Sequence, residues 1–493
     1  MSISLNPATI LSGQGIDVSS LVQQIISEQS GELSVWQGQQ TTLATQEGLL
    51  QGEANNLTNL QTAVAALADP TGALVAQAAT SSNSGVLTAT AQSTAIAATH
   101  SIVVTSLATA GTLYTDPIAS GASTSFLSSG QTTGDVKLQV GGASGTTHDI
   151  AITAGSNDTL TTLANYINTQ SSANGWGVTA SVVSDASGSR LALFSQSTGA
   201  TGALAVTTNS NTTLTFDTPV GGTNAALTID GVPFSSSSNT VTGAIQGVTL
   251  NLVSQSSGTP AQPVQLTVGP DTNQITNAVN NFVSAYNTVI STINSQYVVD
   301  PTGAIPAPPL EGDISLRSLQ SSLLTDAGFA IGGNGGLVNL ASMGINMNND
   351  GTLTVGSTPQ TDSNTPGQTF AQVLSANPSA VINFFQNATA TGFANHFNAD
   401  LTNLTAPSTG PLNVDLTQDQ TEGADLTTTI TNFETNLTNE TAALTAQYDT
   451  VNASLQSYPL LLQEITQTLG TLGSGISASG ATVSSGPTLT SGL

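Results

Sequence analysis

The chain has 493 residues and a formal charge of −26, because 29 acidic residues face only three Lys and Arg. Nucleic acid and anionic membrane surfaces are bound through clustered Lys or Arg, so the composition excludes both as partners. Cysteine is absent, which excludes disulfides and thiolate chemistry. Charged residues make up only 6% of the chain, so Thr, Ser, Asn, Gln and Gly must cover the surface, as suits an exported protein.

The length allows about three or four domains. The N-terminus has neither the basic region nor the apolar segment of a Sec-type signal peptide. No run of 18 apolar residues occurs, so we expect no membrane insertion.

The first 70 residues predict a leader and a long helix. Residues 1–15 read as flexible, Asp17 or Ser19 can cap the helix, and helical patterning runs to about Ala68. Every seventh residue is apolar except Gln29, giving the stripe Val22, Trp36, Leu43, Leu50, Leu57 and Val64. Each glycine within this helix lowers helix stability by about 1 kcal/mol relative to Ala. We therefore expect the helix to be weak alone and to be ordered by assembly with partner helices.

The same seven-residue spacing of apolar side chains returns near the other end of the chain, in the series Ile430, Leu437, Leu444, Val451, Tyr458, Ile465 and Leu472. A strict seven-residue repeat keeps one apolar stripe on a supercoiled helix. We expect the two ends to pair within one chain as a coiled-coil stalk and the pairs to pack on neighbouring copies. A helical bundle within one subunit is the alternative. Thr441 lies off the series, and Pro459 should kink the helix or cost about 3 kcal/mol.

Between the ends the sequence is strand-like and rich in Thr, Ser and Gly. A first strand region spans Gly85 to Tyr114, and a Gly/Ser/Thr-rich stretch at 119–134 follows it. The next unit has two short strands, a short helix that 157–160 caps and that ends near Asn168, and a hairpin, with the strands at Val136–Val140, Ile150–Ile152, Val178–Val183 and Arg190–Phe194.

A third region returns to strands before helical periodicity resumes at about Thr272. Its strands are Ala226–Ile229, Val248–Val253 and Val264–Val268, with Asp230-Gly231 as a turn. The predicted fold is therefore α+β and multidomain, with terminal helices forming a coiled-coil stalk, a helical leg domain and two β-rich head domains.

The expected domains follow this order along the chain. They are 1–70, N-terminal coiled-coil and leg helices; 71–118, first part of an inner β-rich head domain; 119–221, an inserted outer β-rich head domain; 222–270, second part of the inner head domain; 271–422, the helical leg; 423–472, the C-terminal coiled-coil helix; and 473–493, a disordered tail.

Residue patterns that carry chemistry are lacking. His100, His148 and His396 share no metal-ligand spacing, and neither Gly-x-Ser-x-Gly nor a Gly-Lys phosphate loop occurs. Asn346, Asn348, Asp350 and Gly351 echo a calcium loop, but Ser357 stands where a bidentate Glu is needed, so a turn between strands is expected. We expect no enzyme, no cofactor and no metal.

Several segments resemble the flagellar filament cap protein family, also called hook-associated protein 2 or FliD. Residues 15–22 with Glu28 resemble its opening, and 157–168 with 177–182 resemble a motif shared by flagellar axial proteins. Further resemblances, in the family's order, are 229–232, 239–242 with 247–250, 282–287, 350–353 and 381–385.

The resemblance implies a structural protein at the distal end of the bacterial flagellar filament. Such a protein would form a pentamer-like ring of copies, fold and insert exported flagellin subunits, and prevent their loss. Flagellin and the hook–filament junction proteins would be its partners, and an export chaperone would bind the C-terminal segment, here Leu444 to Leu472. The flagellar export apparatus would carry it outside the cell without a cleaved signal peptide.

Three other interpretations stay open at this point. Another axial component, a flagellin or a hook–filament junction protein, shares the terminal helices, but the residues at 230–250 point to the cap. A Thr/Ser-rich surface adhesin would need a signal peptide or an anchor, and a secreted enzyme would need a catalytic constellation. The terminal helices also depart from the family, since they are rich in Gln, Thr and Asn where the family has Lys, Arg and Glu.

Overall fold

The computed structural model describes residues 17–476, apart from 299, 303, 305, 357–367, 388 and 390, and the side chains of 472–476 are not among the described parts. The chain forms two compact units. The helical unit takes residues 1–59, 288–323 and 400–493, and the mixed unit takes 60–287 and 324–399. Helices α3, α5, α6 and α9 continue from one unit into the other.

The N-terminal helix begins at the expected cap but is divided in two. Asp17 caps α2 (Val18–Gln29), its Oδ1 accepting from the Ser20 amide at 3.1 Å. Ser30 separates α2 from α3 (Gly31–Ala68). The helix divides where polar Gln29 interrupts the apolar stripe and Gly31 follows. Neither packing nor helix propensity favours a continuous helix at these positions.

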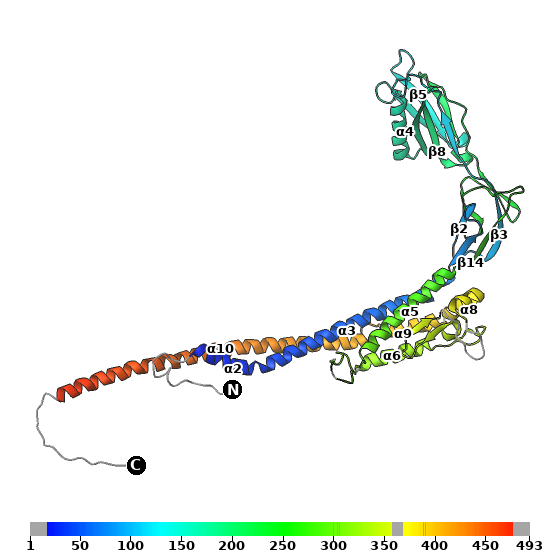
Figure 1. The fold of residues 1–493 in the computed structure, drawn as a ribbon. Coiled ribbons are helices and arrows are strands. Elements are labelled where there is room, and N and C mark those ends of the chain that lie inside the picture. Colours follow the sequence, from blue (N-terminus) through cyan, green and yellow to red (C-terminus); the bar gives the residue numbers. More distant parts are fainter. Residues whose placement is uncertain are drawn as a thin grey trace, which may run out of the picture. The chain divides into compact units, whose positions relative to one another are not determined.

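The C-terminal helix α10 (Pro411–Ile476) is one continuous element (Figure 1). It begins at a proline, which suits a first helical position because its missing N–H would have no helical partner there. Its start lies before the expected residue 423, and its end lies beyond the expected residue 472. The helix also continues through Pro459. The leader expected at 1–15 and the tail beyond 476 lie outside the described residues.

The mixed unit contains a β fold made from two chain segments. Its five-stranded sheet has the order β1-β14-β3-β10-β11, its three-stranded sheet has the order β12-β13-β2, and all pairs are antiparallel. The two sheets share one core that includes Ile102, Leu227, Leu250 and Leu266. The strands are β1 (Gln77–Ser81), β2 (Leu87–Ala91), β3 (Ala98–Ser106), β10 (Ala225–Ile229), β11 (Val232–Ser236), β12 (Thr240–Ile245), β13 (Val248–Leu252) and β14 (Val264–Pro270).

An inserted β fold lies between β3 and β10 in the sequence and has a core of its own. Two three-stranded antiparallel sheets, β4-β8-β7 and β6-β5-β9, enclose this core with helix α4 (Leu160–Asn174). The strands are β4 (Ala110–Tyr114), β5 (Thr133–Val140), β6 (Thr146–Thr153), β7 (Val178–Asp185), β8 (Gly188–Thr198) and β9 (Leu204–Ser210). Since β4 pairs with β8, the chain enters this fold ahead of the boundary expected at residue 118.

The predicted hairpin and the predicted Asp230-Gly231 turn both form, whereas β11 and β12, which follow that turn, were not predicted as strands. β7 and β8 pair from Val178–Ser195 to Asp185–Gly188. Asp230 and Gly231, with φ of 52° and 83°, make the tight turn between β10 and β11, a conformation that Gly and Asp tolerate better than other residues. Thr159, within the expected capping stretch 157–160, caps α4, but the helix ends at Asn174, six residues beyond the predicted Asn168.

The remaining elements of the mixed unit pack around an aromatic cluster. Phe282 and Tyr286 of α5 (Thr272–Ser295) contact Phe397 of α9, with ring centroids 5.9 and 6.3 Å apart. Helices α6 (Ile314–Ala327), α7 (Phe370–Ala376), α8 (Pro378–Phe385) and α9 (Phe393–Leu404), the hairpin β15 (Ile345–Met347) and β16 (Leu353–Val355), and the short 3-10 turns Ala73–Val75, Gly142–Ser144, Ala200–Gly202 and Ala341–Met343 complete the described fold.

Candidate functional site

The N-terminal apolar stripe lies on the covered side of its helices. Val22, Leu50, Leu57 and Val64 are buried, and Trp36 and Leu43 are half-buried. A second covered series lies four residues on and mixes apolar with polar side chains. It comprises Ile26, Leu33, Gln40 and Glu47, all half-buried. The two series together form the two-line seam of a coiled coil.

α2 and α3 pair with α10 inside the helical unit. Trp36 meets Phe433 edge to face, with ring centroids 5.1 Å apart and an interplanar angle of 85°. On one side of this pair Gln29 Nε2 donates to Glu440 Oε1 at 2.9 Å, and on the other Gln40 Nε2 donates to Thr427 Oγ1 at 2.8 Å. Residue numbers fall along α10 as they rise along α2 and α3, so the pairing is antiparallel.

The C-terminal stripe is covered over its first half only. Ile430 and Leu437 are buried at 7% and 9% exposure, and Leu444 is half-buried. Val451, Tyr458 and Ile465 are exposed at 44%, 59% and 50%, and the side chain of Leu472 lies outside the described residues.

Thr441 does not lie away from the seam, as its place off the series implied. It is half-buried, because a helix with 3.6 residues per turn brings positions three or four residues from Leu444 and Leu437 to the same side. Thr438 lies on the exposed side of α10 and is the better reference position.

Large apolar side chains stay exposed where α10 runs past the start of α2 (Figure 1). We call residues 451–469 the bare end of α10. Its exposed side chains are Val451, Tyr458, Leu460, Leu461, Leu462, Ile465 and Leu469. A contiguous apolar surface of this kind is typical of a segment that binds another protein.

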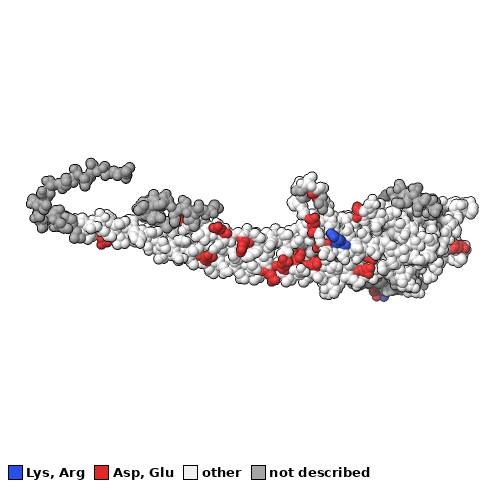
Figure 2. All heavy atoms as spheres, turned by 90° about the horizontal axis from the view of Figure 1, so that it is seen from below, with Lys and Arg blue, Asp and Glu red and all other residues white. Residues whose placement is uncertain are grey.

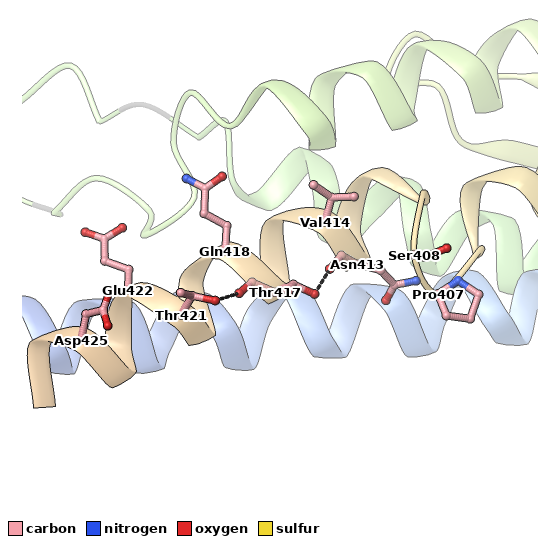
Figure 3. Close-up of a pocket in the computed structure, with 9 residues that line it drawn as sticks. All are labelled: Pro407, Ser408, Asn413, Val414, Thr417, Gln418, Thr421, Glu422 and Asp425. Atoms are coloured by element: carbon pink, nitrogen blue, oxygen red, sulfur yellow. Dashed lines mark hydrogen bonds between the residues drawn. The ribbon is translucent and has the colours of Figure 1, made fainter. Parts of the chain in front are cut away.

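A groove of about 780 Å³ runs beside the first turns of α10 (Figure 3). Its two threonine hydroxyls donate within the helix, Thr417 to the Asn413 carbonyl at 2.7 Å and Thr421 to that of Thr417 at 2.8 Å. The lining residues are Pro407, Ser408, Asn413, Val414, Thr417, Gln418, Thr421, Glu422 and Asp425. This set holds carboxylates, amides and hydroxyls without a histidine or a basic residue.

Two carboxyls of the helical unit have a raised pKa. Burial raises the pKa of Glu53, which is 1% exposed, to about 7, and the bond from Asn56 offsets this only partly. Burial also raises the pKa of Asp419, and the nearby carboxylates of Asp415, Glu422, Glu47 and Asp313 add to the rise.

The charges of the described chain do not form a basic patch. On the face that Figure 2 shows, acidic side chains are scattered and basic ones are isolated. Lys137 pairs with Asp149 at 3.0 Å and Arg190 with Asp185 at 3.7 Å. Arg317 lies over the Tyr297 ring, 5.5 Å from its centroid.

The histidines have structural neighbours. His100 Nδ1 lies 2.8 Å from Asp230 Oδ2, His148 stacks on Trp176, and His396 stacks on Phe329. The residues that echo a calcium loop form the turn of the β15–β16 hairpin, where Asp350 Oδ1 accepts from the Thr352 amide at 3.0 Å. Ser357 lies outside the described residues.

Comparisons with known proteins cover most of the chain. The model of the flagellar hook-associated protein 2 N-terminus matches residues 14–111, and that of its C-terminus matches 222–458. The flagellin hook IN motif matches 135–197, which lies in the inserted β fold.

Similar proteins carry the same description. The B-type flagellar hook-associated protein 2 of Pseudomonas aeruginosa is 31% identical over 69% of this chain and 74% of its own length. The flagellar hook-associated protein 2 of Escherichia coli K12 is 28% identical over 63% of this chain and 68% of its own. The crystal structure of the D1-D2-D3 domains of the flagellar cap protein FliD from Escherichia coli superposes with a TM-score of 0.55 at 25% identity, covering 76% of this chain and 99% of that one. None of the described helices is long and apolar enough to span a membrane.

Proposed function

The chain belongs to the flagellar hook-associated protein 2 family, and we propose that it caps the distal end of a bacterial flagellar filament, where it promotes the folding and insertion of exported flagellin. The observation that supports this best is the match of the family's N- and C-terminal models to the two ends of one chain, 14–111 and 222–458. These two matches favour the cap over a flagellin or a junction protein.

The work of such a cap is steric and makes or breaks no bond. Two features of the helical unit support this role. Its terminal helices pair through a seam that holds polar and half-buried contacts, such as Gln29 with Glu440 and Trp36 with Phe433, so the pairing is modest in strength. Its longest helix ends in exposed apolar side chains that can contact a partner. A leg built this way can release and rebind as each subunit enters.

The two predicted stripes divide into two roles in this proposal. The covered residues Val22, Trp36, Leu43, Leu50, Leu57, Ile430, Leu437 and Leu444 hold the helices together within one chain. The exposed residues Val451, Tyr458 and Ile465 contact other molecules: neighbouring copies in a pentamer-like ring, flagellin at the tip, or an export chaperone before secretion. Leu472 continues the series of Val451, Tyr458 and Ile465. Val64, which is buried on α3, acts with the residues that hold the chain's own helices together.

Ring assembly, flagellin and the hook–filament junction proteins as partners, and passage through the flagellar export apparatus without a cleaved signal peptide are parts of the same proposal. The flagellar family and the shortage of basic residues support an extracellular position at the filament tip.

A strain lacking the gene tests the proposal. It should export flagellin into the medium as monomers and be poorly motile, and the intact gene should restore filaments. Normal filaments in the deletion strain would refute the capping role.

A second comparison separates capping from the proposed contacts. The gene carrying Ile465→Asp should fail to restore motility. Gln467→Asp should restore it, because Gln467 is exposed on the same stretch but lies two residues from Ile465, on another side of the helix. Restoration by both variants would leave capping intact and refute the role of the bare end of α10.

A further inference from the structure

Glu53 is a buried carboxyl in the seam between α3 and α5. Its side chain is 1% exposed, and Asn56, one turn along α3, donates from Nδ2 to its Oε2 at 3.1 Å. The same Nδ2 lies 3.5 Å from Thr292 Oγ1 on α5. Glu53 Oε1 has no hydrogen-bond partner among the described residues.

A second buried acceptor lies in the turn that follows α5. Gln46 Nε2 donates to the Pro309 carbonyl, and Asn56 approaches Thr292. Residue numbers in α5 and the segment after it therefore rise as those along α3 fall, so the two run antiparallel. Glu53 therefore lies level with the turn that follows Thr292, where Gln296 is 7% exposed and its Oε1 lacks a donor among the described residues. An ionised Glu53 would add an acceptor to a place already short of donors, whereas a protonated one supplies an O–H.

Among the described residues, no opposite charge acts on an ionised Glu53. Burial and the bond from Asn56 govern its pKa. The charged and titratable groups of the described neighbouring elements are Glu32 and Glu47 on α3 itself, Tyr286 on α5, Tyr297, Asp300, Glu311 and Asp313 in the following segment, Arg317 and Asp326 on α6, and, in the first part of α10 (411–425), Asp415, Asp419, Glu422 and Asp425.

We propose that Glu53 is a proton-operated latch: its protonated carboxyl closes the seam between α3 and α5, and loss of the proton opens the seam to water. The sign follows from the two states. The carboxyl titrates near 7 in the closed seam and near 4.5 once exposed, so the closed state is favoured at acidic pH and loses its advantage as pH rises from 4.5 through 7. Between pH 5.5 and 8.0 the ratio of open to closed seam should rise roughly 25-fold.

Hydrogen exchange on the full-length protein tests the latch. Amides at 50–59 and 288–295 should exchange roughly 25-fold faster at pH 8.0 than at pH 5.5, after correction for the intrinsic exchange rate. Glu53→Gln mimics the protonated form, so its exchange should be slow at both pH values. Glu32→Gln, at an exposed position of the same helix, should behave as the wild type.

The proposal is overturned if Glu53→Gln keeps the pH dependence of the wild type. A carbon-13 titration of the Glu53 carboxyl gives an independent reading that needs no variant. A midpoint near 7 supports the latch, and a midpoint near 4.5 refutes it. Neither result bears on filament capping, so the latch and the proposed function succeed or fail separately.

Discussion

Shortening Leu437 to Ala should weaken the pairing of α10 with α2 and α3 by about 2 kcal/mol. Deleting a buried Leu side chain costs roughly 2–5 kcal/mol, and the cost falls toward the lower end where the surroundings can relax. Leu437 is 9% exposed in a seam between helices, and it lies on α10 between the contacts of Phe433 and Glu440. We therefore expect the opening equilibrium of this helix pair to shift roughly 30-fold.

Trp36 reports this opening, because it is half-buried against Phe433. In a background with Trp176→Phe it is the one remaining tryptophan, since the chain has two. Unfolding by urea, followed by Trp36 fluorescence, should shift to a midpoint roughly 1 M lower in Leu437→Ala, given slopes of about 1–3 kcal/mol per molar urea. Thr438→Ala, at the exposed neighbouring position, should leave the midpoint unchanged or slightly raised. Equal midpoints for Leu437→Ala and the parent, or a larger loss in Thr438→Ala, would show that the seam has been assigned to the wrong face of α10.

Three further outcomes follow from the same structure. Glu53→Gln should stabilise the helical unit at pH 8 by about 3 kcal/mol and change it little at pH 4, since the pKa of Glu53 lies about 7 in the folded chain against 4.5; equal thermal stability of both proteins at pH 8 would contradict this. A chain ending after Thr450 removes the bare end of α10 and should have a lower mass per particle in light scattering than the full-length protein at micromolar concentration, whereas unchanged assembly would place the contacts elsewhere. Ile465→Asp should remain soluble with an unchanged circular dichroism spectrum and lose assembly, because its side chain is already 50% exposed and does not hold the fold together; a loss of folded structure would argue that this segment packs within its own chain.

The repeat predicted the covered face of the terminal helices because burial in a two-helix seam follows a fixed period. That period holds for Val22, Leu50 and Leu57, which are buried as expected. It does not say where the covering partner ends. Val451, Tyr458 and Ile465 continue the series without a break in sequence but are exposed, since α2 begins at Val18 and pairs no further along α10 in the described chain.

Polar members of a seam escape a search for apolar periodicity. Gln40 and Glu53 lie on the covered side of α3 although both are polar, so apolar spacing alone does not mark their burial. Glu53 accepts a local hydrogen bond from Asn56, one turn along the same helix, whereas its burial depends on tertiary packing that the sequence pattern does not show.

Turn chemistry predicted the hairpins well, whereas element ends were harder to place. Asp230 and Gly231 require positive φ and mark the β10–β11 turn unambiguously. The boundary expected at residue 118 fails because β4 pairs with β8, a long-range contact that composition does not reveal. Likewise α10 begins at Pro411, whereas the C-terminal helix was expected from residue 423. The residues at its start are mostly polar and line the groove, so they lack the periodic apolar face that predicts a helix.

A cross-link between the two terminal helices tests most directly whether they pair within one chain. The natural chain has no cysteine, so Gln29→Cys with Glu440→Cys introduces a single pair at positions whose native side chains are joined by a 2.9 Å hydrogen bond. Two long side chains span this gap, so the thiols are joined with a short bismaleimide and not by oxidation. In dilute protein this reagent should give a cross-linked monomer, and the mismatched pair Gln29→Cys with Thr427→Cys, nearly four turns away on α10, should cross-link poorly. Cross-links that join two chains, or equal yields for the matched and mismatched pairs, would contradict the antiparallel stalk on which the account depends.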